Sequence, residues 1–296
     1  MKLEFLKFWK KKERVPSYSY EGTLREAGRN GDLTVLKSLI DDARDDIKSS
    51  ALRIASKYGR LNIIQYTVEN GYVDLNECGN IAIIACEYGH IDIVRYLVEN
   101  KYSNLQKNLL LVASKFGHLD IVKYVLPEEI FDCYAARTSI RYAIENNNLK
   151  IVKYISDIFK LEQDYDEIFW KSAIESAIKR LRRPNDDNFE IIKYLLEEKK
   201  AYIDIDDNYA LRKASEYGHI ELVKYLLKHN AIRYEKRDTN GFMSLYVASE
   251  FGHLEVVKCL VEKGGINKLE RSHALAGARK YKRENVIAYL TSINKE

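Results

Sequence analysis

Apolar residues in this chain recur in a short unit that holds two helical stripes separated by a glycine. Over residues 50–58, Leu52 and Ala55 have the spacing of one buried helix face. Gly59 can adopt the left-handed backbone conformation that ends a helix, and a second apolar stripe occupies residues 61–68. Because two helices this short cannot bury their apolar faces alone, the pattern predicts that the units stack on one another.

The unit repeats along almost the whole chain. The alanine of its first stripe recurs as Ala27, Ala55, Ala85, Ala113, Ala143, Ala177, Ala214, Ala248 and Ala278. The steps between these alanines range from 28 to 37 residues, and a period of roughly 20–50 residues is typical of a solenoid. We therefore predict an all-α solenoid of about nine helix–turn–helix units over residues 21–296. Such an array presents one long surface, which favours binding over catalysis.

The clearest copy of the unit, residues 238–254, reads DTNGFMSLYVASEFGHL and resembles the ankyrin repeat. It keeps the D-x-x-G turn, a serine at the threonine position (Ser244) and Leu245, whereas Met243 and Tyr246 replace the proline and histidine of that pattern. The resemblance implies an ankyrin solenoid with a concave binding face. Ankyrin repeats have a period of about 33 residues, so the shorter steps predict short or missing β-turn fingers between units.

The recurring signature A-S-x-[YF]-G-H-[LI]-x-[IV]-V-K-Y-[LV] also resembles the large ankyrin families of amoeba-infecting giant viruses, which are mimivirus-like. This resemblance implies a viral protein that acts in the host cytoplasm or is packaged in the virion. An A/T-rich cellular genome would produce the same abundance of lysine and tyrosine.

The candidate partner-binding residues are aromatic–charge pairs just before the turn glycine. They are Lys57, Tyr58, Glu87, Tyr88, Lys115, Phe116, Glu216, Tyr217, Glu250 and Phe251. The ankyrin resemblance places them on the concave face, where large aromatic area with a polar tip suits a protein partner. Alternatively, neighbouring rings pack on each other as part of the stack. Asn30 and Asn147 interrupt the aromatic positions, and an insertion near 178–188 adds a further break, so we expect two separate patches.

That insertion accounts for the longest step in the repeat. Its residues 179–183 hold four basic side chains and are predicted to lengthen the first helix and its turn into a basic protrusion. The protrusion could meet phosphate or an acidic partner, although a solvated helix end is the simpler interpretation.

Four histidines follow the turn glycine, namely His90, His118, His219 and His253. Stacked units lie about 10 Å apart, the usual distance between packed helices, whereas zinc needs its ligands within about 2.0–2.3 Å. We therefore expect no metal site and hydrogen bonds from these histidines to the backbone of the turn.

The second stripe carries a recurring tyrosine, at Tyr66, Tyr96, Tyr124, Tyr154, Tyr194, Tyr225 and Tyr289. These rings are predicted to bridge adjacent second helices with the hydroxyl toward water. A basic residue precedes most of them and is predicted to be solvated, namely Arg95, Lys123, Lys153, Lys193, Lys224 and Lys258.

Charge is concentrated at the amino terminus. Residues 1–15 hold six basic and two acidic residues, a net of +4, and the remainder holds 42 of each sign. The body therefore has no overall field to attract nucleic acid. Residues 1–20 form a basic and aromatic segment that either caps the first unit or remains a tail, and residues 1–15 could contact an anionic membrane.

Composition offers little for catalysis or cofactors. The four cysteines are scattered without a CxxC pair, which fits a reducing intracellular compartment. No catalytic or phosphate-binding motif appears. We therefore expect no cofactor, no enzymatic activity and no transmembrane helix.

The sequence predicts a monomeric protein-interaction scaffold with an unidentified protein partner, located in the cytoplasm. Two alternatives remain open. One is a substrate-recruiting adaptor for host ubiquitination, which would need a second partner surface because the flanks of the array leave no space for an F-box. The other is a membrane-tethered or nucleic-acid-associated factor that uses residues 1–15.

Overall fold

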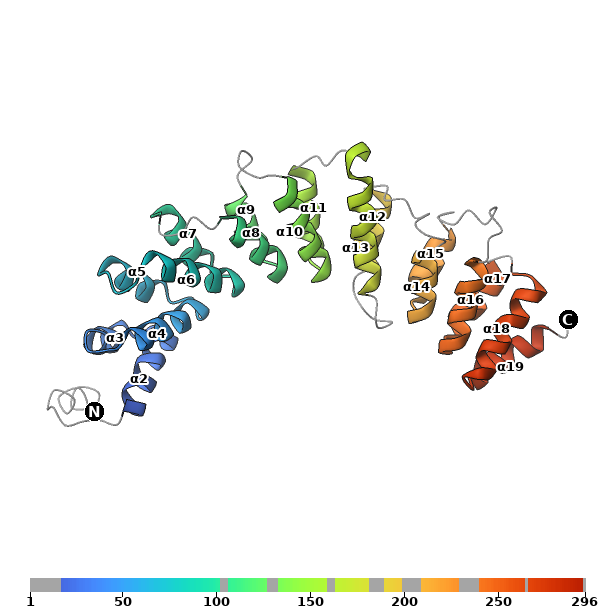
Figure 1. Cartoon of the computed structure of the whole chain (residues 1–296), viewed down its shortest axis with the longest axis horizontal. Helices are drawn as coiled ribbons and strands as arrows, with labels where there is room; N and C mark the ends of the chain where they lie inside the picture. The colour runs from blue at the N-terminus through green and yellow to red at the C-terminus, as the bar shows by residue number, and fades with distance from the viewer. Residues whose placement is uncertain are drawn as a thin grey trace. The chain divides into compact units, whose positions relative to one another are not determined.

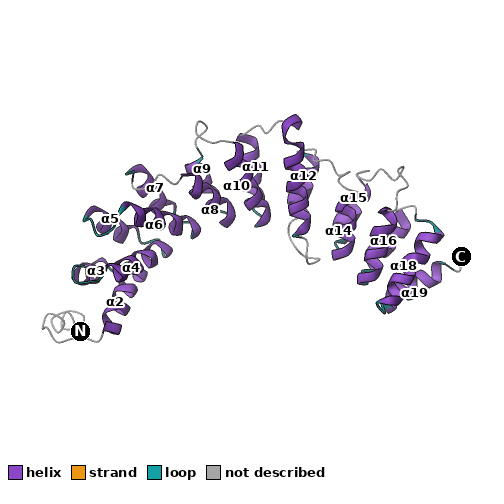
Figure 2. Ribbon diagram, in the orientation of Figure 1, coloured by secondary structure: helices purple, strands orange, loops and turns teal. Residues whose placement is uncertain are grey.

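The computed structural model describes residues 17–101, 106–126, 133–158, 163–180, 189–198, 209–228, 240–263 and 266–294. Over these residues the chain forms eighteen helices and no strand, which confirms the predicted all-α repeat architecture (Figure 2). The helices follow one another as nine antiparallel pairs (Figure 1). Of the predicted amino-terminal cap or tail, residues 1–20, residues 1–16 lie outside the described residues and residues 17–20 belong to the first described helix.

The first helices of the pairs carry even numbers. They are α2 (Ser17–Asn30), α4 (Asp45–Lys57), α6 (Leu75–Glu87), α8 (Gln106–Phe116), α10 (Cys133–Glu145), α12 (Gln163–Lys179), α14 (Tyr209–Tyr217), α16 (Asn240–Phe251) and α18 (Lys268–Lys280). The second helices are α3 (Leu33–Leu39), α5 (Leu61–Glu69), α7 (Ile91–Glu99), α9 (Leu119–Val125), α11 (Leu149–Ile158), α13 (Phe189–Glu197), α15 (Ile220–Lys228), α17 (Leu254–Lys263) and α19 (Glu284–Ile293).

The helices stack in two rows within each of two compact units, residues 1–135 and 136–296. In the first unit, α2, α4, α6 and α8 contact one another in sequence and form the first row, whereas α3, α5, α7 and α9 form the second row. In the second unit, α12, α14, α16 and α18 form the first row, and α15, α17 and α19 contact one another in the second. Stacking of neighbours therefore buries the apolar stripes, as the pattern predicts.

The repeat alanines are buried in the first-row helices. Ala55, Ala85 and Ala113 are 0% exposed, as are their counterparts in the other unit, Ala143, Ala177, Ala214, Ala248 and Ala278. An alanine has no atoms beyond Cβ, so the backbones of stacked helices can approach one another at this position. The core is thus continuous along each row.

The turn between the two helices of a pair requires a left-handed backbone residue. Gly59 and Gly89 have φ of 69° and 80°, and Asn147 and Lys282 take the same place with φ of 59° and 56°. The prediction that Asn147 occupies an aromatic position is therefore wrong by one residue. Asn147 replaces the turn glycine, a substitution that asparagine tolerates better than most residues, and Asn146 occupies the aromatic position.

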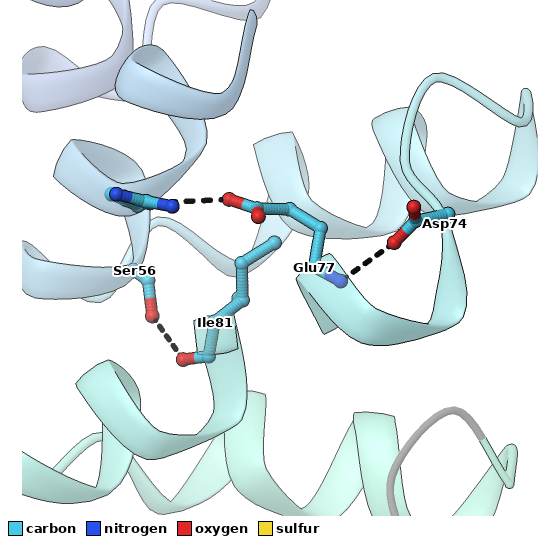
Figure 3. A network of polar contacts seen from close by, with 5 residues as sticks. Ser56, Asp74, Glu77 and Ile81 are labelled. Atoms are coloured by element: carbon cyan, nitrogen blue, oxygen red, sulfur yellow. Dashed lines mark hydrogen bonds and ion pairs between the residues drawn. The ribbon is translucent and has the colours of Figure 1, made fainter. Parts of the chain in front are cut away.

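Polar side chains tie successive first-row helices together (Figure 3). The Ser56 hydroxyl, fully buried, donates a hydrogen bond of 2.7 Å to the carbonyl of Ile81 in the next first-row helix. At the start of that helix, the Asp74 carboxylate caps α6 by accepting from the Glu77 amide at 2.7 Å. The Glu77 carboxylate also pairs with Arg53 of α4 at 3.2 Å. The Ser56–Ile81 and Arg53–Glu77 contacts each join residues more than twenty positions apart, whereas the Asp74 cap is local.

The connections between pairs are short where the structure describes them. Only residues 40–44 separate α3 from α4, and residues 70–74 separate α5 from α6, with no strand in either. This agrees with the short or missing fingers expected from the reduced repeat period.

Contrary to expectation, the insertion near residues 178–188 does not lengthen α12, the first helix of its pair, at the carboxyl end. Helix α12 ends at Lys179, two residues after Ala177, and α4 likewise ends two residues after Ala55. Helix α12 is longer, at 17 residues, because it begins earlier relative to its alanine. The extra residues therefore follow the helix, and residues 181–188 lie outside the described residues.

Three cysteines are buried as reduced thiols, namely Cys78, Cys86 and Cys259. Burial raises the pKa of Cys86 to about 12, and its thiol donates to the Leu109 carbonyl at 3.2 Å. Burial also raises the pKa of Cys78 and of Cys259. Because the thiolate is the reactive form, all three are protected in the folded state.

We expect the Cys133→Ser variant to react slowly with iodoacetamide at mildly alkaline pH while folded, and rapidly in denaturant. The substitution removes the fourth cysteine, so that the modification, followed by mass spectrometry, reports only on the three buried thiols. Fast native labelling of Cys86 would contradict its placement between α6 and α8.

Candidate functional site

The candidate aromatic residues lie exposed at the ends of first-row helices. In the first unit, Tyr58, Tyr88 and Phe116 retain 38%, 42% and 44% of their surface. In the second unit, Phe251 retains 47%, whereas Tyr217 is half-buried. Large apolar side chains seldom remain this exposed in a regular series, and such surfaces mark interaction sites more often than isolated exposed residues do.

The aromatic residues do not stack on one another. None of the ring contacts within the described part of the chain joins two of the candidate rings. Phe251 instead lies parallel to the His253 ring of its own unit, with centroids 6.4 Å apart. The alternative in which the rings pack together as part of the stack is therefore not supported by these contacts.

Cations cover the faces of the rings in the first unit. The Arg29 guanidinium lies 5.1 Å from the Tyr58 ring centroid, and the Lys57 ammonium lies 4.9 Å from that of Tyr88. In both cases the cation comes from the preceding first-row helix. A hydrogen bond with the Tyr88 side chain raises the pKa of Lys57, which keeps it charged. The sequence did not single out Arg29, because its own unit has an asparagine at the aromatic position.

Beyond Tyr88, the cation over a candidate ring comes from the same helix as the ring. Lys115 lies over Phe116 of its own unit, at 5.2 Å, because Glu87 occupies the position from which a preceding cation would reach that ring. In α14, Lys213 lies 5.7 Å from the Tyr217 centroid and pairs with Glu216 at 2.6 Å. The charge beside the rings is thus partly neutralised within the second unit.

Half-buried aliphatic residues lie one helical turn before the exposed rings. Ile54 precedes Tyr58 by four residues, and Ile84 and Val112 hold the equivalent positions in α6 and α8. Residues four apart share one helix face. Each helix therefore presents an aliphatic patch next to an exposed ring and a charge, a composition typical of protein-interaction surfaces.

The histidines after the turn glycine join neighbouring units. The Nε2 group of His90 donates to the Lys57 carbonyl at 2.8 Å, and that of His118 donates to the Glu87 carbonyl at 2.9 Å. His253 makes the same contact with the Glu216 carbonyl at 2.9 Å. The prediction of a backbone hydrogen bond is confirmed for these three, but the acceptor is the end of the preceding first-row helix rather than their own turn.

Arginine replaces histidine in two further units. Arg60 Nε donates to the Arg29 carbonyl at 2.8 Å, and Arg283 Nε donates to the Glu250 carbonyl at 2.8 Å. These donors satisfy carbonyls at helix ends that lack a partner within the helix. The residues that supply these carbonyls also carry the charged side chains next to the rings. The hydrogen bonds therefore also hold the backbone from which those side chains extend.

We expect His118→Ala to lower the free energy of unfolding by about 1 kcal/mol, because it removes a hydrogen bond to the Glu87 carbonyl. The change should also increase amide hydrogen exchange in the last turn of α6. Denaturant unfolding and hydrogen exchange measure the two effects, and His273→Ala, an exposed histidine of α18, is the control. Equal losses at both positions would contradict a role in joining units.

Two of the second-row tyrosines bridge neighbouring helices, as predicted, whereas the Tyr194 hydroxyl is buried and not directed toward water. The Tyr225 hydroxyl donates to Glu197 of the preceding second-row helix at 2.9 Å, and Tyr96 donates to Glu69 at 3.4 Å. Burial raises the pKa of Tyr225 and that of Tyr194 to about 12.

The basic residues Arg95 and Lys153 beside those tyrosines are exposed, as predicted, and each also lies over a tyrosine ring. Arg95 lies 5.3 Å from the Tyr124 centroid, and Lys153 lies 5.2 Å from that of Tyr194, in the next unit each time. Lys37 covers Tyr66 in the same way, at 4.5 Å. A cation can lie over a ring because the ring face carries partial negative charge.

The described part of the basic insertion forms ion pairs. Lys179 pairs with Glu175 of its own helix at 3.8 Å, and Arg180 pairs with Glu145 of α10 at 3.7 Å.

In the described part of the chain, no three acidic, histidine or cysteine side chains gather as a metal site would require. Likewise, none of the described helices is both long and apolar enough to cross a membrane.

Comparison with known families identifies the class of protein. The family model described as "Ankyrin repeats (3 copies)" matches residues 24–108 and 180–272, which is more than half of the chain. The chain belongs to the ankyrin-repeat family. Repeats of this family are generally protein–protein interaction modules and typically serve non-enzymatic scaffolds. A search of curated proteins found no match.

Proposed function

We propose that this chain is a non-enzymatic scaffold that binds a partner protein through the exposed ends of its first-row helices. The observation that supports this most directly is the series of exposed rings, with Tyr58, Tyr88 and Phe116 each more than a third exposed. The binding residues in this proposal are Lys57, Tyr58, Glu87, Tyr88, Lys115, Phe116, Glu216, Tyr217, Glu250 and Phe251. A few aromatic residues usually dominate the energy of a protein interface.

We expect the double variant Tyr88→Ala/Phe116→Ala to lose its partner while keeping its fold. Removal of one such ring costs about 2 kcal/mol, which corresponds to roughly 30-fold in Kd. Affinity purification with quantitative mass spectrometry from the native cell would compare this variant with the wild type and with Lys123→Ala, an exposed change on α9. Circular dichroism monitors the fold.

Two results would contradict the proposal. One is recovery of the same proteins by the wild type and the double variant. The other is unfolding of the double variant with no loss specific to binding, since the rings would then be part of the core.

The proposal also includes the place in the cell where the protein acts. The recurring A-S-x-[YF]-G-H signature supports a giant-virus source and a place in the host cytoplasm or the virion, where the scaffold could recruit substrates for ubiquitination. The basic residues 1–15 support membrane contact as an alternative. Co-sedimentation with anionic vesicles, full-length chain against residues 16–296, tests the membrane contact; equal sedimentation of both would exclude it.

A further inference from the structure

Charge at the ends of the first-row helices differs between the two units. The residue two positions after the repeat alanine is Arg29 in α2 and Lys57 in α4, whereas α14 and α16 carry Glu216 and Glu250 there. Arg53, one turn before Lys57, is exposed but pairs with Glu77 at 3.2 Å, so it adds no unpaired charge to this region. The ends of α2 and α4 thus present two neighbouring cations, although Glu87 holds the same position in α6 and residues 16–296 carry equal numbers of each charge.

Arg29 and Lys57 are positioned by aromatic rings rather than by carboxylates. Each lies over the ring at the end of the next first-row helix, at 5.1 Å and 4.9 Å. Neither forms an ion pair with another described residue. Both side chains are exposed. A guanidinium that lies on a ring still directs its N–H donors outward in its own plane, where carboxylate oxygens can accept them.

Apolar surface lies next to these cations. Ile54 and Ile84 are half-buried, one turn before Tyr58 and Tyr88 on the same helix faces. A ligand that meets the two cations would therefore also contact aliphatic side chains and ring edges. Burial of apolar area would add affinity, and the charges would add specificity.

We propose that the Arg29–Tyr58 and Lys57–Tyr88 pairs bind an acidic segment of a partner protein. Its carboxylates face the two cations, and an apolar side chain of the segment lies on Ile54 and Ile84. This inference rests on the proposed scaffold function and adds the chemistry of the partner. Single-stranded nucleic acid fits less well, because its bases need open ring faces for stacking and a cation already lies over one face of Tyr58 and of Tyr88.

The test selects peptides from a random phage-displayed library on the immobilised full chain. We expect the selected peptides to be enriched in Asp and Glu. Their binding should weaken between about 0.1 M and about 1 M salt, as the screening length falls from about 10 Å to about 3 Å. Arg29→Glu/Lys57→Glu should weaken the best peptide roughly tenfold or more.

Two cations on second-row helices of the same compact unit, residues 1–135, provide a matched control. Lys37→Glu/Arg95→Glu removes two cations that also lie over tyrosine rings, at 4.5 Å and 5.3 Å. It makes the same change in net charge and should leave peptide binding within about twofold, since both cations lie on second-row helices and not at the ends of the first-row helices. Circular dichroism and thermal unfolding check that both double variants remain folded.

The outcomes separate this inference from the scaffold proposal. If the selected peptides lack acidic residues but lose binding in Tyr88→Ala/Phe116→Ala, the scaffold proposal stands and the acidic partner is wrong. If no peptide is selected, or binding is insensitive to both the ring and the cation variants, both are wrong. Tight binding of oligo-dT that is lost in Arg29→Glu/Lys57→Glu would replace the acidic segment with nucleic acid.

Discussion

Replacement of Gly59 with alanine should destabilise the protein more than the same replacement at Gly71. Both glycines have φ of 69°, so each alanine incurs the left-handed strain of about 1–2 kcal/mol. A Cβ at Gly59 would also lie 2.6 Å from Nδ1 of His90, whereas nothing lies within 4 Å of a Cβ at Gly71. To make room, His90 must swing away from the Lys57 carbonyl, which adds about 1–3 kcal/mol of overpacking and lost hydrogen bonding.

Denaturant unfolding of the two variants measures the difference, for which we expect about 1–3 kcal/mol. The double variant Gly59→Ala/His90→Ala provides a further check, because removal of the imidazole should relieve the crowding and make the two changes less than additive. Additive losses, or equal destabilisation by Gly59→Ala and Gly71→Ala, would show that the histidine does not restrict the turn.

Ala85→Leu should destabilise the first row of the first unit on both sides of α6. Helix α6 contacts α4 on one side and α8 on the other, and Ala85 is 0% exposed between them. A leucine there forces both neighbours apart, which costs about 1–3 kcal/mol or more. The same change at Ala278, also 0% exposed, should cost less, because among the described first-row helices α18 contacts α16 alone.

Urea unfolding midpoints of the two alanine variants, each against the wild type, test this expectation. Hydrogen exchange should show the loss of protection centred on α4–α8 for Ala85→Leu and on α16–α18 for Ala278→Leu, because each repeat contacts mainly its neighbours. Equal losses of stability, spread over the whole chain in both variants, are incompatible with a linear array.

The helices themselves could be predicted from the sequence with little error. Spacing of apolar residues, a small residue at Ala55 and a glycine at Gly59 act within one unit; the alanine recurs in all nine units and the glycine in six of them. Errors arose where the repeat was irregular. Asn147 was assigned to the aromatic position although it takes the place of the glycine, and the residues after Lys179 were assigned to the helix that they follow.

The candidate site was only partly predictable. The sequence singled out Tyr88 and Lys57 as members of recurring pairs in their own units. It could not show that Lys57 lies over Tyr88 of the next unit, or that Arg29 belongs to the same surface. These contacts join residues about thirty positions apart, and their geometry depends on the distance between stacked helices.

The repeating pairs of helices, their turns and the buried alanines follow from the sequence alone, because they depend on local backbone preference and on apolar spacing within one unit. The carbonyl that each histidine reaches, the ring that each cation covers and the large side chains that stay exposed are set only when the units pack together. Those outcomes depend on how one unit packs against the next, and His118 illustrates the difference: its position after a glycine is visible in the sequence, whereas its acceptor, the Glu87 carbonyl, comes into reach only after stacking.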